Sequence, residues 1–185
     1  MAPETSAPLS HPVRVETIKP RGSHVTVTAA GETLARIATV LGLASLEALE
    51  ARYELSRNGD RVKLAGEIAA ELHQTCIVTL DPFPVSLKVP VKLDFVPEAE
   101  ALAAAEREQS RDDKGEIDLE ILLNEDDPPE PIIDGVIDLG AITVEFLALA
   151  LDPYPRKPGA SFDADLGSSR EESPFAVLAK LKRGE

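Results

Sequence analysis

The chain has 185 residues, a single cysteine and a formal net charge of −14 at pH 7. This length suits one domain with a hydrophobic core of its own, and the lone Cys76 excludes an intramolecular disulfide, as is usual in a reducing compartment. The N-terminus lacks a basic region followed by an apolar one, and no apolar stretch is long enough to span a bilayer. We therefore expect a cytoplasmic protein with no membrane partner.

The negative charge is concentrated in one part of the chain. Between Glu98 and Asp134 there are 14 acidic and 3 basic residues, a balance of −11, whereas all other residues together carry −3. Charge blocks of this kind are typical of solvated segments. We predict a single domain at 13–185 with an acidic, mobile insertion at about 98–131, preceded by a disordered tail at 1–12 that is rich in Pro, Ser and Ala.

The first elements predicted along the chain are short. Alternation of apolar and polar residues predicts strands at 13–17 and 24–30, separated by a loop around Gly22. The helical spacing i, i+3, i+4 and i+7 is filled by Leu34, Ile37, Ala38 and Leu41. This pattern predicts a helix at 32–41 that ends at Gly42.

A β-hairpin is the clearest structural signal. Asn58-Gly59 separates two runs of alternating hydrophobicity, and this pair favours the positive φ angles of a type I′ turn. Folding the chain there places Leu55 opposite Val62 and Tyr53 opposite Leu64. Both pairs are apolar, so the turn chemistry and the hydrophobic register agree.

A third strand is predicted after the pentapeptide LDPFP at 80–84. Apolar residues hold the odd positions from Phe83 to Phe95, and a connection at 79–82 would place Cys76 opposite Val85. Pro90 has no N–H group, so we expect this strand to lie at an edge of the sheet. The pentapeptide is then a connection between two antiparallel strands.

A nearly identical pentapeptide, LDPYP at 151–155, follows a strongly apolar segment. Asp138 is a suitable N-cap, and the pattern predicts a helix at 139–151 that ends at Pro153 and Pro155. Because one copy follows a strand and the other follows a helix, we interpret both as segments that terminate secondary-structure elements rather than as a shared binding element. The predicted fold class is α+β: an antiparallel β-sheet, open or strongly curled, with helices packed on its apolar face.

Catalytic and metal-binding motifs are not evident. The three histidines are scattered, and no grouping of a nucleophile with a base is visible. His73 and Cys76 form an H-x-x-C, but residues three apart on a strand point to opposite faces. We therefore expect Cys76 to be a buried thiol, and we predict a protein that is not an enzyme and needs no cofactor or metal.

Basic residues gather towards the C-terminus. They are Arg156, Lys157, Lys180, Lys182 and Arg183. The segment SPFAVLAKLKRGE has Pro174 at a first helical position and spaces Phe175, Leu178 and Leu181 along one face. The segment is either a terminal helix docked on the core or a basic amphipathic element offered to an RNA or protein partner, and the first interpretation is favoured because charged tails are common on surfaces.

Three stretches carry a family resemblance: QTCIVTLDPF, VIDLGAITVEFLALALDPYPRKPG and the terminal SPFAVLAKLKRG. In this order they resemble the YceD family of large-subunit ribosomal RNA accumulation proteins, from about residue 13 to the end of the chain. Many members carry C-x-x-C where this chain has Cys76 and Thr79, so any metal or redox role of that pair does not carry over.

The resemblance implies a non-enzymatic factor that supports the synthesis, processing or stability of large-subunit ribosomal RNA. Its partner would be ribosomal RNA, a pre-ribosomal particle, or a ribosomal or biogenesis protein, and the five basic residues near the C-terminus are the candidate contacts. The alternative is a protein-interaction adaptor that docks a partner through the edge strand and the C-terminal helix. A hydrolytic enzyme has little support, because no nucleophile–base grouping appears.

Overall fold

A computed structural model describes residues 7–103 and 128–161. The elements in chain order are β1 (Pro12–Arg14), the 3-10 helix η1 (Val15–Thr17), β2 (Ser23–Ala29), α1 (Glu32–Val40), β3 (Ser45–Asn58), β4 (Arg61–Thr75), β5 (Pro82–Pro97), β6 (Glu130–Ile132), β7 (Val136–Asp138) and α4 (Leu139–Ala150). The α+β class predicted from the sequence is confirmed. No helix in these two ranges combines the length and apolar character needed to cross a membrane.

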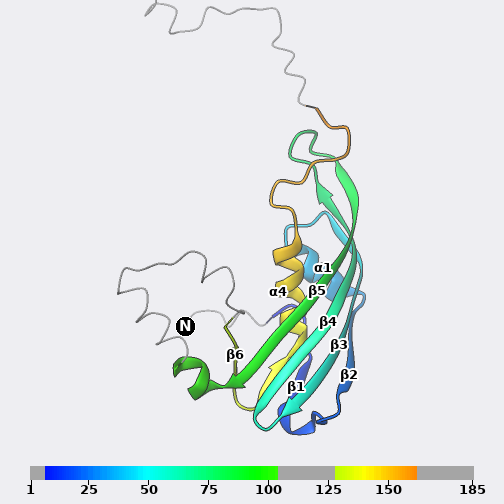
Figure 1. Ribbon diagram of the computed structural model, residues 1–185. Coiled ribbons are helices and arrows are strands. Elements are labelled where there is room, and N and C mark those ends of the chain that lie inside the picture. Colours follow the sequence, from blue (N-terminus) through cyan, green and yellow to red (C-terminus); the bar gives the residue numbers. More distant parts are fainter. Residues whose placement is uncertain (1–6, 104–127, 162–185) are drawn as a thin grey trace, which may run out of the picture.

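Long antiparallel strands form a curved sheet with the order β2-β3-β4-β5-β6. β2 to β5 are antiparallel, and β6 adds a short parallel pairing to β5 at Phe95 to Pro97. Figure 1 shows α1 and α4 against the same side of this sheet. Side chains alternate between the helix-covered face and solvent, as the period of two requires. The five-stranded sheet is open and is mixed rather than purely antiparallel because of β6, and β1 and β7 form a separate two-stranded sheet.

Both helices follow the sequence pattern closely. α1 buries Ile37 and Ala38 and packs mainly on β3. α4 begins after Asp138, whose side chain accepts hydrogen bonds from the N–H groups of Gly140 and Ala141, and this confirms the predicted N-cap. Leu139 and Leu147 of α4 are fully buried in the core.

The register of the β3–β4 hairpin differs from the predicted one by two residues. Asn58 pairs with Arg61, so the loop is Gly59-Asp60, and Tyr53 lies opposite Gly66 rather than Leu64. Gly59 has a φ of 63° and Asp60 has a negative φ, which is the pattern of a type II′ turn and not of type I′. A shift of two residues leaves every side chain on its predicted face, so the hydrophobic pattern alone does not distinguish the two registers.

The predicted β4–β5 register is wrong by four residues. Leu72 pairs with Val85 and Thr75 with Pro82, so the connection is longer than predicted and spans Cys76 to Asp81. LDPFP does contribute to a strand-to-strand connection, as expected. From Pro82 to Asp94, β5 pairs with β4 on one side and with no other strand that the structure describes, which confirms its edge position.

Residues 10–12 belong to the fold and not to the predicted disordered tail. β1 pairs with β7, with Pro12 opposite Asp138, and the His11 N–H donates to Asp138 Oδ1 at 2.7 Å. The predicted strand at 13–17 is thus shorter and turns into η1 at Val15. The proposed mobile insertion lies mostly outside the described residues, although 98–103 are helical and β6 forms within its last residues.

Candidate functional site

The segments around the two pentapeptides lie against each other at one end of the molecule. The connection Cys76–Asp81 lies against the segment Leu151–Lys157 that follows α4, and we call these two segments together the junction. The Ile77 N–H donates to the Pro155 carbonyl at 2.9 Å, and the Gln74 side-chain amide donates to the Asp152 carbonyl at 3.1 Å. Two segments that the sequence analysis treats as separate chain terminations therefore form one surface.

Local hydrogen bonds and prolines determine the backbone conformation of each half of the junction. Asp152 Oδ1 accepts the Tyr154 N–H at 2.8 Å, a turn typical of Asp, and Pro153 and Pro155 prevent α4 from continuing. In the other half, the Leu80 N–H donates to the Cys76 carbonyl at 2.9 Å while Leu80 has a φ of 61°. Left-handed backbone is uncommon for a residue with a branched side chain.

Cys76 lies inside the junction with none of its surface exposed, which confirms that the thiol is buried. It is not on a strand, however, so the argument from strand faces was wrong. The Lys157 backbone N–H, together with N–H groups of Thr79 and Val78 and the Thr79 hydroxyl, lowers the pKa of Cys76 to about 7 against the effect of burial. Within the described ranges, no three His, Cys, Asp or Glu side chains come together as metal ligands.

Two of the five predicted contact residues lie on the junction. The Arg156 and Lys157 side chains are exposed, and Lys157 Nζ lies 3.6 Å from Asp81 Oδ2. Among the residues with described positions, no carboxylate pairs with Arg156. Lys180, Lys182 and Arg183 lie outside the described residues, so the structure does not place them beside the other two.

The sequence did not single out the apolar and aromatic part of this surface. The pentapeptide aromatics have opposite environments: Phe83 is 8% exposed and Tyr154 is 71% exposed. Leu80 is 75% exposed and Ile77 is 44% exposed. The replacement of Phe by Tyr between the two copies is the sequence signal that could have indicated this difference, because a tyrosine carries a polar hydroxyl.

A Ser–His–Glu grouping lies on β3 and β4 near the same end. Ser45 Oγ is 3.2 Å from His73 Nδ1, and Glu47 Oε1 is 2.8 Å from the same nitrogen. In a catalytic triad the serine and the carboxylate contact different ring nitrogens. The Ser45 hydroxyl, with some help from His73, lowers the pKa of Glu47. This grouping is therefore a surface hydrogen-bond cluster without the geometry of a nucleophile and its base.

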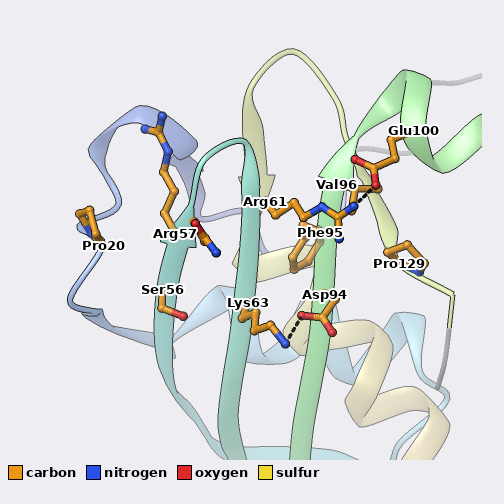
Figure 2. A pocket seen from close by; sticks show the side chains of 11 residues that line it. Pro20, Ser56, Arg57, Arg61, Lys63, Asp94, Phe95, Val96, Glu100 and Pro129 are labelled. Atoms are coloured by element: carbon orange, nitrogen blue, oxygen red, sulfur yellow. Dashed lines mark hydrogen bonds and ion pairs between the residues drawn. The ribbon is translucent and has the colours of Figure 1, made fainter.

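A cavity of about 780 Å³ lies at the opposite end of the sheet, beside the β3–β4 turn (Figure 2). Its cationic side chains are Arg57, Arg61 and Lys63. Arg61 is ion-paired with Glu100, and Lys63 Nζ lies 3.5 Å from Asp94 Oδ1. Arg57 donates to the carbonyl oxygens of Gly59 and Val15. Two of these three cations thus have a carboxylate partner, as Lys157 has at the junction, whereas Arg156 pairs with no described carboxylate.

The comparison with family models identifies the chain. The model described as large ribosomal RNA subunit accumulation protein YceD matches residues 64–182. The chain therefore belongs to the YceD family, as the motifs indicated, although the matched range begins well after residue 13. It covers most of β4, all of β5 and α4, and both halves of the junction. No curated protein and no solved structure gives a significant match.

Proposed function

We propose that this protein supports the accumulation of large-subunit ribosomal RNA by binding ribosomal RNA or a pre-ribosomal particle in the cytoplasm, without catalysis. The observation that carries the proposal is membership of the YceD family, whose name links the chain to the large ribosomal RNA. The contact surface we propose is the junction, through Arg156 and Lys157, with Lys180, Lys182 and Arg183 as further contacts from the C-terminal segment.

The charge distribution supports this choice of surface. Arg156 and Lys157 are adjacent, exposed and outside the acidic segment, and exposed basic side chains bind phosphates with release of counterions. Lys157 Nζ forms an ion pair with Asp81 Oδ2 at 3.6 Å, but an exposed ion pair contributes little to stability. A phosphate can therefore replace Asp81 as the partner of Lys157 at a small cost.

The absence of catalysis is part of the proposal. Cys76 is fully buried, and the His73 nitrogen that faces Ser45 is also the one that faces Glu47. Neither Cys76 nor Ser45 is therefore arranged for nucleophilic attack on a substrate. The features of the junction that remain available to a ligand are its charges and its exposed apolar groups.

The experiment is co-sedimentation of purified protein with pre-ribosomal particles. The double variant Arg156→Ala, Lys157→Ala should bind several-fold more weakly than wild type, and its affinity should depend less steeply on salt because fewer phosphates are neutralised. The matched control is Lys19→Ala, Arg21→Ala, which removes the same two charges from exposed positions near the opposite end of the sheet. Equal binding by wild type and the junction variant would contradict the proposed surface.

The adaptor alternative is favoured by one observation, the edge of β5 between Pro82 and Asp94 that is unpaired within the described residues. An exposed edge can receive a strand from a partner. This edge contains Pro82, Pro84 and Pro90 together with Lys88 and Lys92, and prolines and lysines are typical means of preventing such pairing. We therefore keep RNA binding as the leading proposal.

A further inference from the structure

Tyr154 is the exposed aromatic residue of the described fold. The other described aromatics are Tyr53 at 2% exposure, Phe95 at 5% and Phe83 at 8%, with Phe146 half-buried against the core. Tyr154 is 71% exposed, so it contributes little to the core. A tyrosine that the core does not use is a candidate for ligand contact, because tyrosine combines an apolar ring with a polar hydroxyl and is enriched at interfaces.

The backbone that carries this ring is held firmly. Tyr154 lies between two prolines, its N–H donates to Asp152 Oδ1 at 2.8 Å, and the neighbouring Pro155 carbonyl accepts the Ile77 N–H at 2.9 Å. The ring is therefore presented on a segment that is hydrogen-bonded to the end of the sheet. A contact made by a side chain on such a preorganised backbone loses less conformational entropy than one made from a free tail.

The rest of the junction places cationic and apolar side chains near the Tyr154 ring, and a nucleic-acid strand needs both kinds of group. Arg156 and Lys157 follow Tyr154 after the intervening Pro155, and both are exposed. Ile77 and Leu80 add apolar surface, and Leu80 adopts its left-handed backbone with the side chain in solvent. Residues other than glycine with a positive φ occur often at ligand sites. Stacking rings combined with cations are the usual elements of single-strand binding surfaces.

We propose that the junction binds single-stranded RNA, with an unpaired base stacked on the Tyr154 ring and the flanking phosphates contacted by Arg156 and Lys157. This inference rests on the proposed function and specifies the state of the RNA. A base within a duplex is already stacked on both faces and cannot lie on a protein ring, whereas bases in loops and at ends can. The preferred target is therefore an unpaired stretch and not a helix of the RNA.

The test compares variants in their binding to a fluorescently labelled, unstructured 12-nucleotide RNA and to a duplex of the same sequence. Tyr154→Ala should weaken single-strand binding by roughly 5- to 150-fold, the range given by the loss of one base–aromatic stack. Tyr154→Phe should bind like wild type, because the ring and not the hydroxyl makes the contact. Leu149→Ala is the matched control, since Leu149 is 75% exposed on α4 outside the junction, and it should bind like wild type.

Each remaining outcome is informative. If Tyr154→Ala binds the single strand like wild type while Arg156→Ala, Lys157→Ala binds pre-ribosomal particles weakly, stacking is wrong and the proposed function stands. A preference of wild type for the duplex would also overturn the inference. If wild type binds neither RNA nor pre-ribosomal particles, the inference and the proposed function both fail. Unchanged melting temperatures of the variants exclude misfolding as the cause.

Discussion

Tyr53 Oη lies 2.8 Å from Thr143 Oγ1 in the core, where it joins β3 to α4. Thr143 has one hydroxyl proton, and Oγ1 lies 2.6 Å from the Leu139 carbonyl. Thr143 therefore donates to Leu139, and Tyr53 donates to Thr143. Through this chain of hydrogen bonds, the helix that precedes the junction is fixed to the centre of the sheet.

Removing either hydroxyl should destabilise the fold to different extents. Thr143→Val leaves the buried Tyr53 hydroxyl without an acceptor and should cost about 1–3 kcal/mol, whereas Tyr53→Phe should cost about 0.5–1.5 kcal/mol because Thr143 keeps its own acceptor. Urea unfolding of the two single variants and the double variant measures both values and their coupling. Additive losses would show that the hydroxyls do not interact.

The pKa of Tyr53 is raised by burial, with the hydrogen bond to Thr143 acting in the opposite direction. The folded state then keeps its phenolic proton at a pH where the unfolded chain loses it. The contribution of Tyr53 is fully present below pH 10 and is lost as the pH rises above that value. Compared with Tyr53→Phe, wild type should therefore lose stability more steeply above pH 10 in thermal unfolding.

Gly66→Ala should be strongly destabilising. An added Cβ would lie 2.3 Å from the Arg52 carbonyl oxygen and 2.6 Å from Tyr53 Cδ1, so either the strand or the ring has to move. We expect a loss of about 1–3 kcal/mol in urea unfolding, which is the usual cost of overpacking. Ala65→Gly on the neighbouring exposed position is a control for β propensity alone, and a larger loss there than at Gly66 would contradict the register.

Cys76 should titrate as a thiolate with a pKa of about 7, because the Lys157 N–H and the other donors around it outweigh the effect of burial. As the chain has one cysteine, absorbance at 240 nm reports on it directly, and Cys76→Ser serves as the blank. A depressed pKa stabilises the fold at high pH. The stability of wild type relative to Cys76→Ala should rise between pH 7 and pH 9 and be smallest below pH 7; a flat difference would contradict ionisation in the folded state.

Gly140→Ala should release the N-terminal segment from α4. A Cβ at this position would lie 2.7 Å from both the His11 nitrogen and Ser10 Cα, so β1 could not keep its pairing with β7. Amide hydrogen exchange at residues 11–14 should become faster, while exchange in β4 changes little. Retained protection at these residues would show that the segment is held by other contacts.

The sequence predicted the locally determined parts of the fold. α1 and α4 were found from their spacing and from the Asp138 cap, and the strand faces from alternation, because each signal lies within about ten residues. Registers were not determined in this way. Register shifts of two or four residues leave each side chain on the same face of the sheet. The observed registers depend on tertiary contacts instead: Tyr53 packs where Gly66 has no side chain, and the Ile77 N–H donates to the Pro155 carbonyl. The pairing of β1 with β7 joins three-residue strands more than 120 residues apart, which no local pattern indicates.

For the candidate site, the sequence indicates charged residues but not the shape of the surface that carries them. Arg156 and Lys157 were found because basic residues cluster there, but charge carries no information about which segments meet. The contact between the connection after β4 and the segment after α4 depends on the tertiary fold. Tyr154 was missed because its pentapeptide resembles the one in which Phe83 is buried, and burial is decided by the surrounding chain.

The most direct test of the central claim is ultraviolet cross-linking in living cells, followed by sequencing of the attached RNA and mass spectrometry of the attached peptide. Our account predicts that large-subunit ribosomal RNA or its precursor is recovered, with cross-links in the segment Leu151–Lys157 and at unpaired nucleotides. Recovery of protein cross-links alone, or of RNA attached only elsewhere on the chain, would contradict it.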